Sequence, residues 1–165
     1  MDSLHEAVIL EAELLPLLRE RLAAGQTIRY LPFRGVSMLP MLRQGKDMVE
    51  LSPLPERLEK YDLPVYQYPS GKVVMHRVVG VREDCYICLG DNTYAYEHVR
   101  PEWMIARVSA FKRGDHRIPV ENPGYRLYAR VWVALFPLRR FLRKGRIWLG
   151  KYLRPVKQWL RRHLK

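Results

Sequence analysis

Cysteine is scarce in this chain. The 165 residues contain only Cys85 and Cys88, which lie in the string CYIC. A structural zinc site uses about four ligands, and no second cysteine pair accompanies this one. Residues three apart in a strand point to opposite faces, which argues against a disulfide between the two. We therefore interpret both as ordinary strand cysteines in a reducing compartment, and we expect neither a metal nor a cofactor.

Long apolar runs are also missing. The longest, VWVALFPL at Val131–Leu138, contains a proline and is too short to cross a bilayer, which takes about 20 apolar residues. The first residues, MDSLHEAVILEAE, include acidic residues where a secretion signal has basic ones, so no cleaved signal peptide is expected. These absences predict a cytoplasmic protein that is at most peripheral on the inner face of the membrane.

Acidic residues are absent from the end of the chain. Residues 124–165 contain 13 Lys or Arg and no Asp or Glu, whereas residues 1–123 contain 16 basic and 17 acidic residues. The net charge of +12 therefore belongs to the tail. A chain of this length is expected to form one domain with extra elements. The sequence thus predicts a nearly neutral body with a cationic extension.

The body is helical at first and then rich in strands. Ser3 and Glu6 form a capping-box signature, and apolar residues recur at helical spacing until Gly25, which is placed to end the helix. From Thr27 onward, short runs rich in Val, Ile, Tyr and Phe alternate with turn residues, as in a compact antiparallel sheet or barrel. The runs are TIRYLPF, DMVELSPL, LPVYQY, KVVMHRVVGVRE, CYICLGD, MIARVSAFKRG and HRIPV, with YPSGK as a hairpin turn.

After the string ENPGY the helical period returns. The apolar residues that recur three or four positions apart are Leu127, Val131, Leu135, Leu138 and Leu142. Gly145 and Pro155 are expected to divide this helical region. The sequence predicts a mainly β protein with an N-terminal helical segment at 1–26, a β-rich core at 27–122 and a basic amphipathic helical tail at 123–165.

One serine stands in an unusual setting. The string GVSMLP, residues 35–40, places Ser37 among apolar residues and just before a proline. By itself Gly-x-Ser indicates a turn more often than a nucleophile. It is not the nucleophile elbow of esterases, because that motif needs glycine two residues after the serine, where this chain has Leu39. Ser37 is a candidate nucleophile only if the chain also supplies a base and a group that orients the base.

The candidate base is a histidine in an apolar segment. His76 lies within VVMHRVVGV, where an imidazole is costly unless it has partners, although a well-satisfied core histidine gives the same pattern. His98, in a polar loop, is a weaker candidate. Downstream, the string LGDN has the composition of a tight turn. It nevertheless provides the carboxylate of Asp91, and Glu97 follows shortly after.

Taken in order, GVSMLP, VVMHRVVGV and LGDN resemble the serine, base and Gly-Asp-Asn boxes of the type I signal peptidases, to which the LexA-type self-cleaving repressors are related. The resemblance covers about half of the chain, from Tyr30 to Val108. It implies the β-rich fold of that superfamily. The bacterial enzymes have a lysine base followed by arginine. The pair His76-Arg77 resembles the archaeal and endoplasmic-reticulum branch, in which histidine replaces the lysine.

The resemblance implies roles for individual residues. Ser37 matches the nucleophile and His76 the general base. In the histidine branch an acidic residue shortly after Gly-Asp-Asn orients the histidine; Glu97 occupies about that position and Asp91 matches the aspartate of the box, so both remain candidates. The backbone N–H of Ser37 is expected to stabilise the oxyanion. The other matching positions, expected to shape the site, are Gly35, Met38, Pro40, Arg77, Gly90 and Asn92.

The sequence therefore predicts a serine endopeptidase that cleaves a leader or signal-like peptide through an acyl-enzyme, without a cofactor or metal. Two alternatives remain. One is a non-catalytic peptide-binding or scaffold module with the same fold, and the other is a self-cleaving LexA-like regulator. The first helix carries several glutamates and does not resemble the hydrophobic anchor of signal peptidases.

The tail mixes aromatic residues with its cations, a pattern typical of an interfacial helix on anionic lipid. The aromatic residues are Trp132, Phe136, Phe141, Trp148 and Trp159. In one alternative the apolar stripe packs on the protein's own core and the basic face is solvated. In the other the tail binds nucleic acid, which we disfavour because no helix-turn-helix or RNA-binding motif is present. The expected partners are a peptide substrate and an anionic membrane surface.

Overall fold

The computed structural model describes residues 14–32 and 34–145. The chain divides into two compact units, one that ends at Ala129 and one that begins at Arg130. The first unit contains all the strands, so the protein is mainly β, as predicted. No described helix is both long enough and apolar enough to cross a membrane.

A short helix precedes the sheets. Residues 14–23 are helical, and Leu15 and Leu22 on this helix are buried in the main core. Gly25 has a φ of 76°, and its N–H donates to the carbonyl of Leu22 at 3.0 Å. Glycine adopts this left-handed conformation without the steric penalty of a side chain, so it ends the helix as predicted. The predicted capping box at Ser3 lies outside the described residues.

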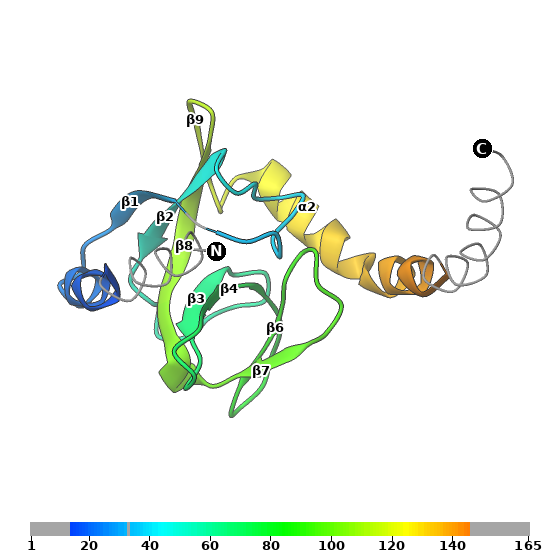
Figure 1. Ribbon diagram of the computed structural model, residues 1–165, viewed down its shortest axis with the longest axis horizontal. Coiled ribbons are helices and arrows are strands. Elements are labelled where there is room, and N and C mark those ends of the chain that lie inside the picture. Colours follow the sequence, from blue (N-terminus) through cyan, green and yellow to red (C-terminus); the bar gives the residue numbers. More distant parts are fainter. Residues whose placement is uncertain (1–13, 33, 146–165) are drawn as a thin grey trace, which may run out of the picture. The chain divides into compact units, whose positions relative to one another are not determined.

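The larger sheet has six antiparallel strands in the order β1–β2–β8–β3–β4, with β9 also paired to β8. Its strands are β1 (Ile28–Pro32), β2 (Asp47–Ser52), β3 (Pro64–Gln67), β4 (Val73–Met75), β8 (Met104–Arg113) and β9 (His116–Pro119). The long strand β8 is central (Figure 1). The predicted hairpin turn between β3 and β4 is confirmed, since the N–H of Tyr68 donates to the carbonyl of Lys72 at 2.9 Å.

The smaller sheet has three antiparallel strands in sequence order. These are β5 (Arg77–Val81), β6 (Tyr86–Leu89) and β7 (Glu97–Val99), and a 3₁₀ helix, η1 (Pro101–Trp103), leads from β7 to β8. Two expectations were wrong here. The string VVMHRVVGV forms two strands in different sheets, and the polar segment at Glu97 and His98 is part of a strand.

The first error has a visible cause. His76, Arg77 and Val78 are all buried, although successive side chains of a strand point to opposite faces. A strand with one solvated face cannot bury three consecutive residues. Burial of all three becomes feasible where the chain leaves one sheet and enters another, and that corner is His76.

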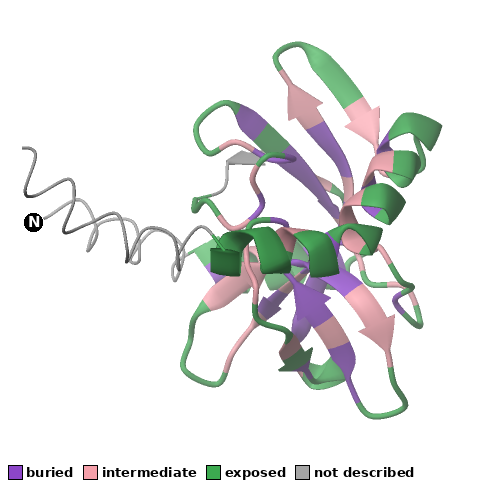
Figure 2. Cartoon of the chain, turned by 90° about the vertical axis from the view of Figure 1, so that its right-hand side faces the viewer, coloured by how far each residue is buried: buried purple, intermediate pink, exposed green. Residues whose placement is uncertain are grey.

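Two apolar clusters fill the first unit. The larger contains Leu42, Val49 and Val108 and receives Tyr125 from the C-terminal helix. The smaller contains Tyr66, Val78 and other residues near the three-stranded sheet. Strand β8 serves both clusters, because Met104 belongs to the smaller and later residues belong to the larger. Figure 2 shows buried segments in the strands of both sheets and mainly exposed positions on the helices.

The C-terminal helical region starts with α2 (Pro123–Ala134). Asn122 caps it, since its side-chain oxygen accepts a hydrogen bond from the N–H of Tyr125 at 3.2 Å. Residues 136–145 are helical again after a break at Leu135. The predicted division at Gly145 lies at the last described residue, and the one at Pro155 lies outside the described residues.

Candidate active site

The candidate nucleophile lies in the loop between β1 and β2. Ser37 is partly exposed, whereas Met38 beside it is buried in the larger core cluster, which fixes the loop from below. Gly35 has a φ of 104°, and its N–H donates to the side-chain oxygen of Gln44 at 2.8 Å. The N–H of Leu42 closes the following turn on the carbonyl of Met38 at 2.9 Å. The serine is thus presented on a turn held on both sides.

The candidate base occupies the corner between the two sheets. His76 follows β4 of the larger sheet and precedes β5 of the smaller one, and it is 5% exposed. Its Nδ1 lies 2.7 Å from Oε2 of Glu97 and 3.3 Å from the hydroxyl of Tyr66. Glu97 comes from β7 of the smaller sheet and Tyr66 from β3 of the larger one. The imidazole therefore lies at the junction of the two sheets, which we call the seam, and one group from each sheet holds it there.

The carboxylate of Glu97 accepts hydrogen bonds from two neighbours. Nδ1–H of His76 and the hydroxyl of Tyr66 both donate to its Oε2. Burial opposes ionisation of Glu97, but these two hydrogen bonds outweigh burial and lower the pKa of the carboxyl. Burial, together with the hydrogen bond to Glu97, raises the pKa of the Tyr66 hydroxyl far above its ordinary value, so this group remains a donor. An ionised Glu97 fixes the proton of His76 on Nδ1, which leaves Nε2 as the basic nitrogen.

Glycine at position 90 lets the base approach the serine loop. A Cβ built on Gly90 would lie 2.9 Å from Nε2 of His76, 2.9 Å from the carbonyl oxygen of Ser37 and 2.8 Å from Cγ2 of Thr93. Nε2 and the Ser37 carbonyl thus converge on one point beside this glycine. Any larger residue at this position would push the imidazole and the serine loop apart.

Three polar groups of His76 and Ser37 have no hydrogen-bond partner among the described residues. Within residues 14–32 and 34–145, Nε2 of His76 forms no hydrogen bond, and neither the hydroxyl nor the backbone N–H of Ser37 does. The backbone of Ser37 and Nε2 of His76 therefore lie near each other beside Gly90, without a direct hydrogen bond between the serine hydroxyl and the imidazole. Catalytic hydrogen bonds are often long or misaligned in a protein without substrate and tighten when substrate binds.

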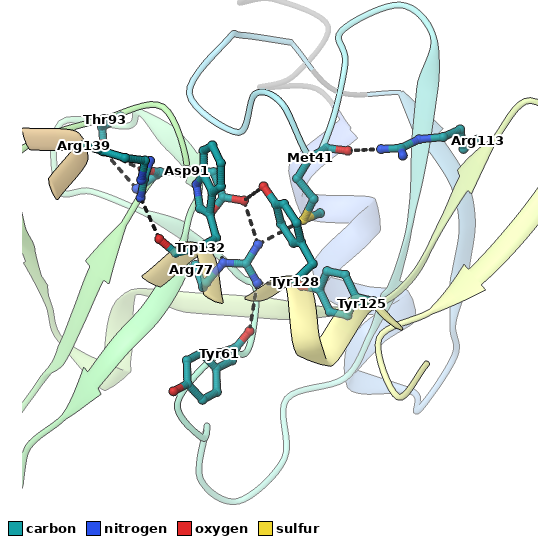
Figure 3. A network of polar contacts seen from close by, with 11 residues as sticks. Met41, Tyr61, Arg77, Asp91, Thr93, Arg113, Tyr125, Tyr128, Trp132 and Arg139 are labelled. Atoms are coloured by element: carbon teal, nitrogen blue, oxygen red, sulfur yellow. Dashed lines mark hydrogen bonds and ion pairs between the residues drawn. The ribbon is translucent and has the colours of Figure 1, made fainter. Parts of the chain in front are cut away.

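A buried ion pair lies next to the base. Arg77 is 0% exposed, and its guanidinium binds Asp91 through two hydrogen bonds, at 2.9 Å from Nε and 2.8 Å from Nη2 (Figure 3). Nη1 also donates to the hydroxyl of Tyr125 at 2.8 Å, and the hydroxyl of Tyr128 donates to Asp91 at 3.2 Å. Burial disfavours the charge on Arg77, but Asp91 outweighs it and raises the pKa of the guanidinium. The ion pair joins strand β5, the turn after β6 and helix α2.

The three residues of the Gly-Asp-Asn turn have separate contacts. Gly90 gives room to His76, and Asp91 holds Arg77. The backbone N–H of Asn92 donates to the carbonyl of Ser37 at 2.7 Å, and its side-chain amide donates to the carbonyl of Val36 at 3.2 Å. The turn therefore connects the serine loop to the strand that begins directly after the base.

Most of the residues singled out in the sequence meet at this seam. Ser37, His76, Glu97, Gly90 and Asn92 are connected by the contacts above. Of the two carboxylates that remained candidates, Glu97 contacts the imidazole, while Asp91 binds Arg77 in the buried ion pair. His98, the weaker candidate base, is exposed on β7, and Pro40, in the same turn as Ser37, is also exposed.

Sequence reasoning missed the tyrosines. Tyr66, Tyr125 and Tyr128 complete the two polar networks, yet tyrosine is common in strands and on helix faces, so their pattern gave no signal. The spacing of three between Tyr125 and Tyr128 does place both on one side of a helix, but a partner could not be inferred from it.

The cysteines do not join the site as reactive groups. Both are free thiols and buried, and burial raises the pKa of Cys88 to about 12. Such a thiol stays protonated at neutral pH and is a poor nucleophile. In the part of the chain that the structure describes, no group of three His, Cys, Asp or Glu side chains is placed to hold a metal ion.

No protein-family model matches this chain, and no curated protein matches it either.

Proposed function

We propose that this protein is a serine endopeptidase with the signal-peptidase and LexA-like fold, in which Ser37 is the nucleophile and His76 the general base. One observation carries the proposal. Nε2 of His76 and the backbone of Ser37 converge on Gly90, while Nδ1 of the same imidazole is held by Glu97 at 2.7 Å. A base beside a hydroxyl, oriented by a third group, is the arrangement that activates serine.

The reaction is acyl transfer to water. The Ser37 hydroxyl attacks the carbonyl carbon of a peptide bond, and its proton passes to Nε2 of His76. The carboxylate of Glu97 stabilises the imidazolium through Nδ1–H. The proton then goes to the leaving amine, the C–N bond breaks, and the acyl group remains on Ser37. Water, deprotonated by the same nitrogen, releases the acid and restores the serine.

The oxyanion of the tetrahedral intermediate needs hydrogen-bond donors. The backbone N–H of Ser37 has no partner among the described residues, and the turn around it is held by Asn92 and Gln44. A fixed, unpaired N–H next to the nucleophile is suited to this role, because it requires no reorganisation when the charge develops. The substrate we propose is a peptide or leader segment that reaches the seam in extended form.

The test is cleavage of a peptide pool. The full chain is incubated with peptides prepared from a whole proteome, and the new termini are identified by mass spectrometry. We expect wild-type protein to generate a reproducible set of termini, and Ser37→Ala and His76→Ala each to lose it. Ser52→Ala is the matched control, because its hydroxyl, bonded to the carbonyl of Arg107, lies on the larger sheet. Cleavage that persists in Ser37→Ala would refute the proposal.

A further inference from the structure

The C-terminal helical region has two apolar faces. One face buries Tyr125 and Ala129 in the first unit. The other is the outer stripe, which consists of the exposed residues Leu127, Val131, Leu135, Leu138, Phe141 and Leu142. At about 100° per residue, these six positions fall within about 120° of the helix circumference. The stripe is therefore continuous along the helix and separate from the face that packs.

The helix remains regular enough to keep the stripe aligned. The N–H of Leu135 donates to the carbonyl of Val131, and the N–H of Arg139 donates to the carbonyl of Leu135, both at 2.9 Å. These bonds link each residue to the one four positions earlier across the break at Leu135. Phe141 is 72% exposed and Leu127 is 63% exposed. A contiguous apolar surface of this kind marks an interaction site, because the outer face of a helix on a globular protein is normally polar.

Cations border the stripe. Arg126, Arg130, Arg140 and Lys144 follow one flank at helical spacing. On the opposite flank, Arg139 lies over the ring of Trp132, with its guanidinium carbon 4.1 Å from the ring centroid, and donates to the carbonyl of the same residue at 3.0 Å. No acidic residue occurs from Gly124 to Lys165, against 13 Lys or Arg. The charge along this helix is thus of one sign only.

We propose that the outer stripe of this helix inserts into the headgroup region of an anionic lipid bilayer, with the flanking cations on the lipid phosphates. An interfacial helix combines an apolar stripe, an aromatic residue such as Phe141 and basic flanks in this way. Each basic residue near an anionic surface adds a favourable contribution, so both halves of the pattern are used at once.

Other occupants fit less well. A second copy of the chain would bring two sets of cations together, without a single acidic residue on this segment to offset them. A nucleic acid would contact the cations but leave the six apolar side chains in water. Only a surface that is apolar inside and negatively charged outside matches both features.

The same helix is tied to the candidate active site. Leu127 of the stripe lies between Tyr125 and Tyr128, whose hydroxyls bond to Arg77 and Asp91 beside the base. The proposed insertion of the stripe into lipid does not rest on the proposed peptidase function, and the two proposals can fail separately.

The test is flotation of the full chain with vesicles. One set contains phosphatidylcholine alone and the other contains equal parts of phosphatidylcholine and phosphatidylglycerol. We expect partition into the anionic vesicles to exceed that into the neutral ones by about tenfold or more, because the cations act only on the anionic surface. The triple variant Leu127→Gln, Val131→Gln and Leu138→Gln should lose about tenfold or more, because less apolar area enters the lipid.

Two matched controls separate the explanations. The variant Leu17→Gln, Met48→Gln and Leu54→Gln removes three exposed apolar residues elsewhere and should bind like wild type. Ser37→Ala should also bind like wild type, so failure of the peptidase proposal would leave this one intact. Equal flotation of the stripe variant and wild type, equal flotation with both vesicle types, or no flotation would each overturn the proposal. So would a concentration-dependent dimer that the stripe variant abolishes in the absence of vesicle binding.

Discussion

His76 and Arg77 are consecutive residues with opposite surroundings. The imidazole of His76 lies at the seam, where its Nδ1 contacts the partly exposed carboxylate of Glu97. Its Nε2, which has no partner in the part of the chain that the structure describes, lies near the serine loop. The guanidinium of Arg77 is fully buried and donates hydrogen bonds to Asp91, to the hydroxyl of Tyr125 and to the sulfur of Met41. A satisfied buried pair fixes structure, whereas an incompletely satisfied group in reach of substrate can do chemistry. Under the proposed function, this dipeptide contributes both the reacting group and the buried ion pair that supports it.

The largest expected effect is on catalysis and comes from replacing His76. We expect His76→Gln to lower kcat/KM for a peptide found in the pool by about 10⁴ to 10⁶, because the serine loses its base. The free energy of unfolding should change by no more than about 2 kcal/mol, as for a typical single substitution. Steady-state kinetics and urea unfolding measure the two quantities. A large loss of stability with activity retained per folded molecule would reverse the assignment of the two residues.

Disruption of the Arg77–Asp91 ion pair should lower the free energy of unfolding. Asp91→Asn leaves the buried charge of Arg77 without its counter-ion, so the free energy of unfolding should fall by about 3 to 5 kcal/mol. Urea unfolding followed by circular dichroism measures the change. Asp115→Asn is the control, since this aspartate is fully exposed and pairs with Lys112 at the surface. If both variants unfolded at the same urea concentration, the ion pair would not hold strand β5 and the turn after β6 together.

Gly90→Ala should disturb the approach of His76 to the serine loop. The added Cβ would lie 2.9 Å from Nε2 of His76 and from the carbonyl of Ser37, so the serine loop must move. We expect a loss of about 1 to 3 kcal/mol in the free energy of unfolding, together with a fall in kcat/KM. Gly80→Ala is the control on β5, because its Cβ would meet only the side chain of Ile87, at 3.3 Å. Unchanged activity in Gly90→Ala would show that the base and the serine loop are not in close contact.

Tyr66→Phe tests whether the tyrosine positions Glu97. The variant removes one donor from the carboxylate, and hydrogen bonds to charged groups contribute about 1.5 to 3 kcal/mol. We expect kcat/KM to fall about tenfold to a hundredfold and the acid limb of the pH profile of kcat/KM to move to higher pH, because loss of the Tyr66 donor raises the pKa of the Glu97 carboxyl. Tyr86→Phe is the control, since that hydroxyl accepts from the N–H of Leu58. A fall in stability alone, with the pH profile unmoved, would assign Tyr66 a purely structural role.

The smallest effect is a pH dependence of stability. The folded pKa of Glu97 is lowered, so its ionised form contributes to the free energy of unfolding above the ordinary carboxyl pKa of about 4.3 and this contribution is lost as the pH falls through the folded value. The contribution is on the order of 1 kcal/mol, because the carboxylate is partly exposed. Wild type should therefore lose stability on acidification more steeply than Glu97→Gln.

Urea unfolding between about pH 6 and pH 3 spans the window in which this carboxylate titrates. Glu102→Gln, at an exposed carboxylate paired with Arg100, should follow wild type. Identical slopes for all three proteins would mean that the hydrogen bonds to Glu97 do not stabilise its charged form.

Much of the fold followed from local pattern. The strand runs were visible because their Val, Ile and Tyr residues stand between turn residues, and Gly25 ended the first helix where predicted. The corner at His76 was not visible, since an apolar string looks the same whether it forms one strand or two. Strand β7 was missed because its three residues, EHV, pair with β6 only through the tertiary structure.

The candidate site divided in the same way. Ser37, His76 and the Gly-Asp-Asn turn were identified by their order and by resemblance to a known family. The choice between Asp91 and Glu97 could not be made from sequence, because both lie downstream of the base and only the fold decides which one reaches it. The contacts of Tyr66, Tyr125 and Tyr128 could not be predicted from sequence for the same reason.

Trapping the acyl group tests the central claim most directly. The full chain is mixed with an activated peptide ester, quenched in acid, and the site of acylation is mapped by mass spectrometry. We predict an acyl group on Ser37 that forms in wild type and Asp115→Asn, and that fails to form in Ser37→Ala and His76→Ala. An acyl group on another residue, or one that forms on Ser37 equally well without His76, would contradict a serine nucleophile activated by this base.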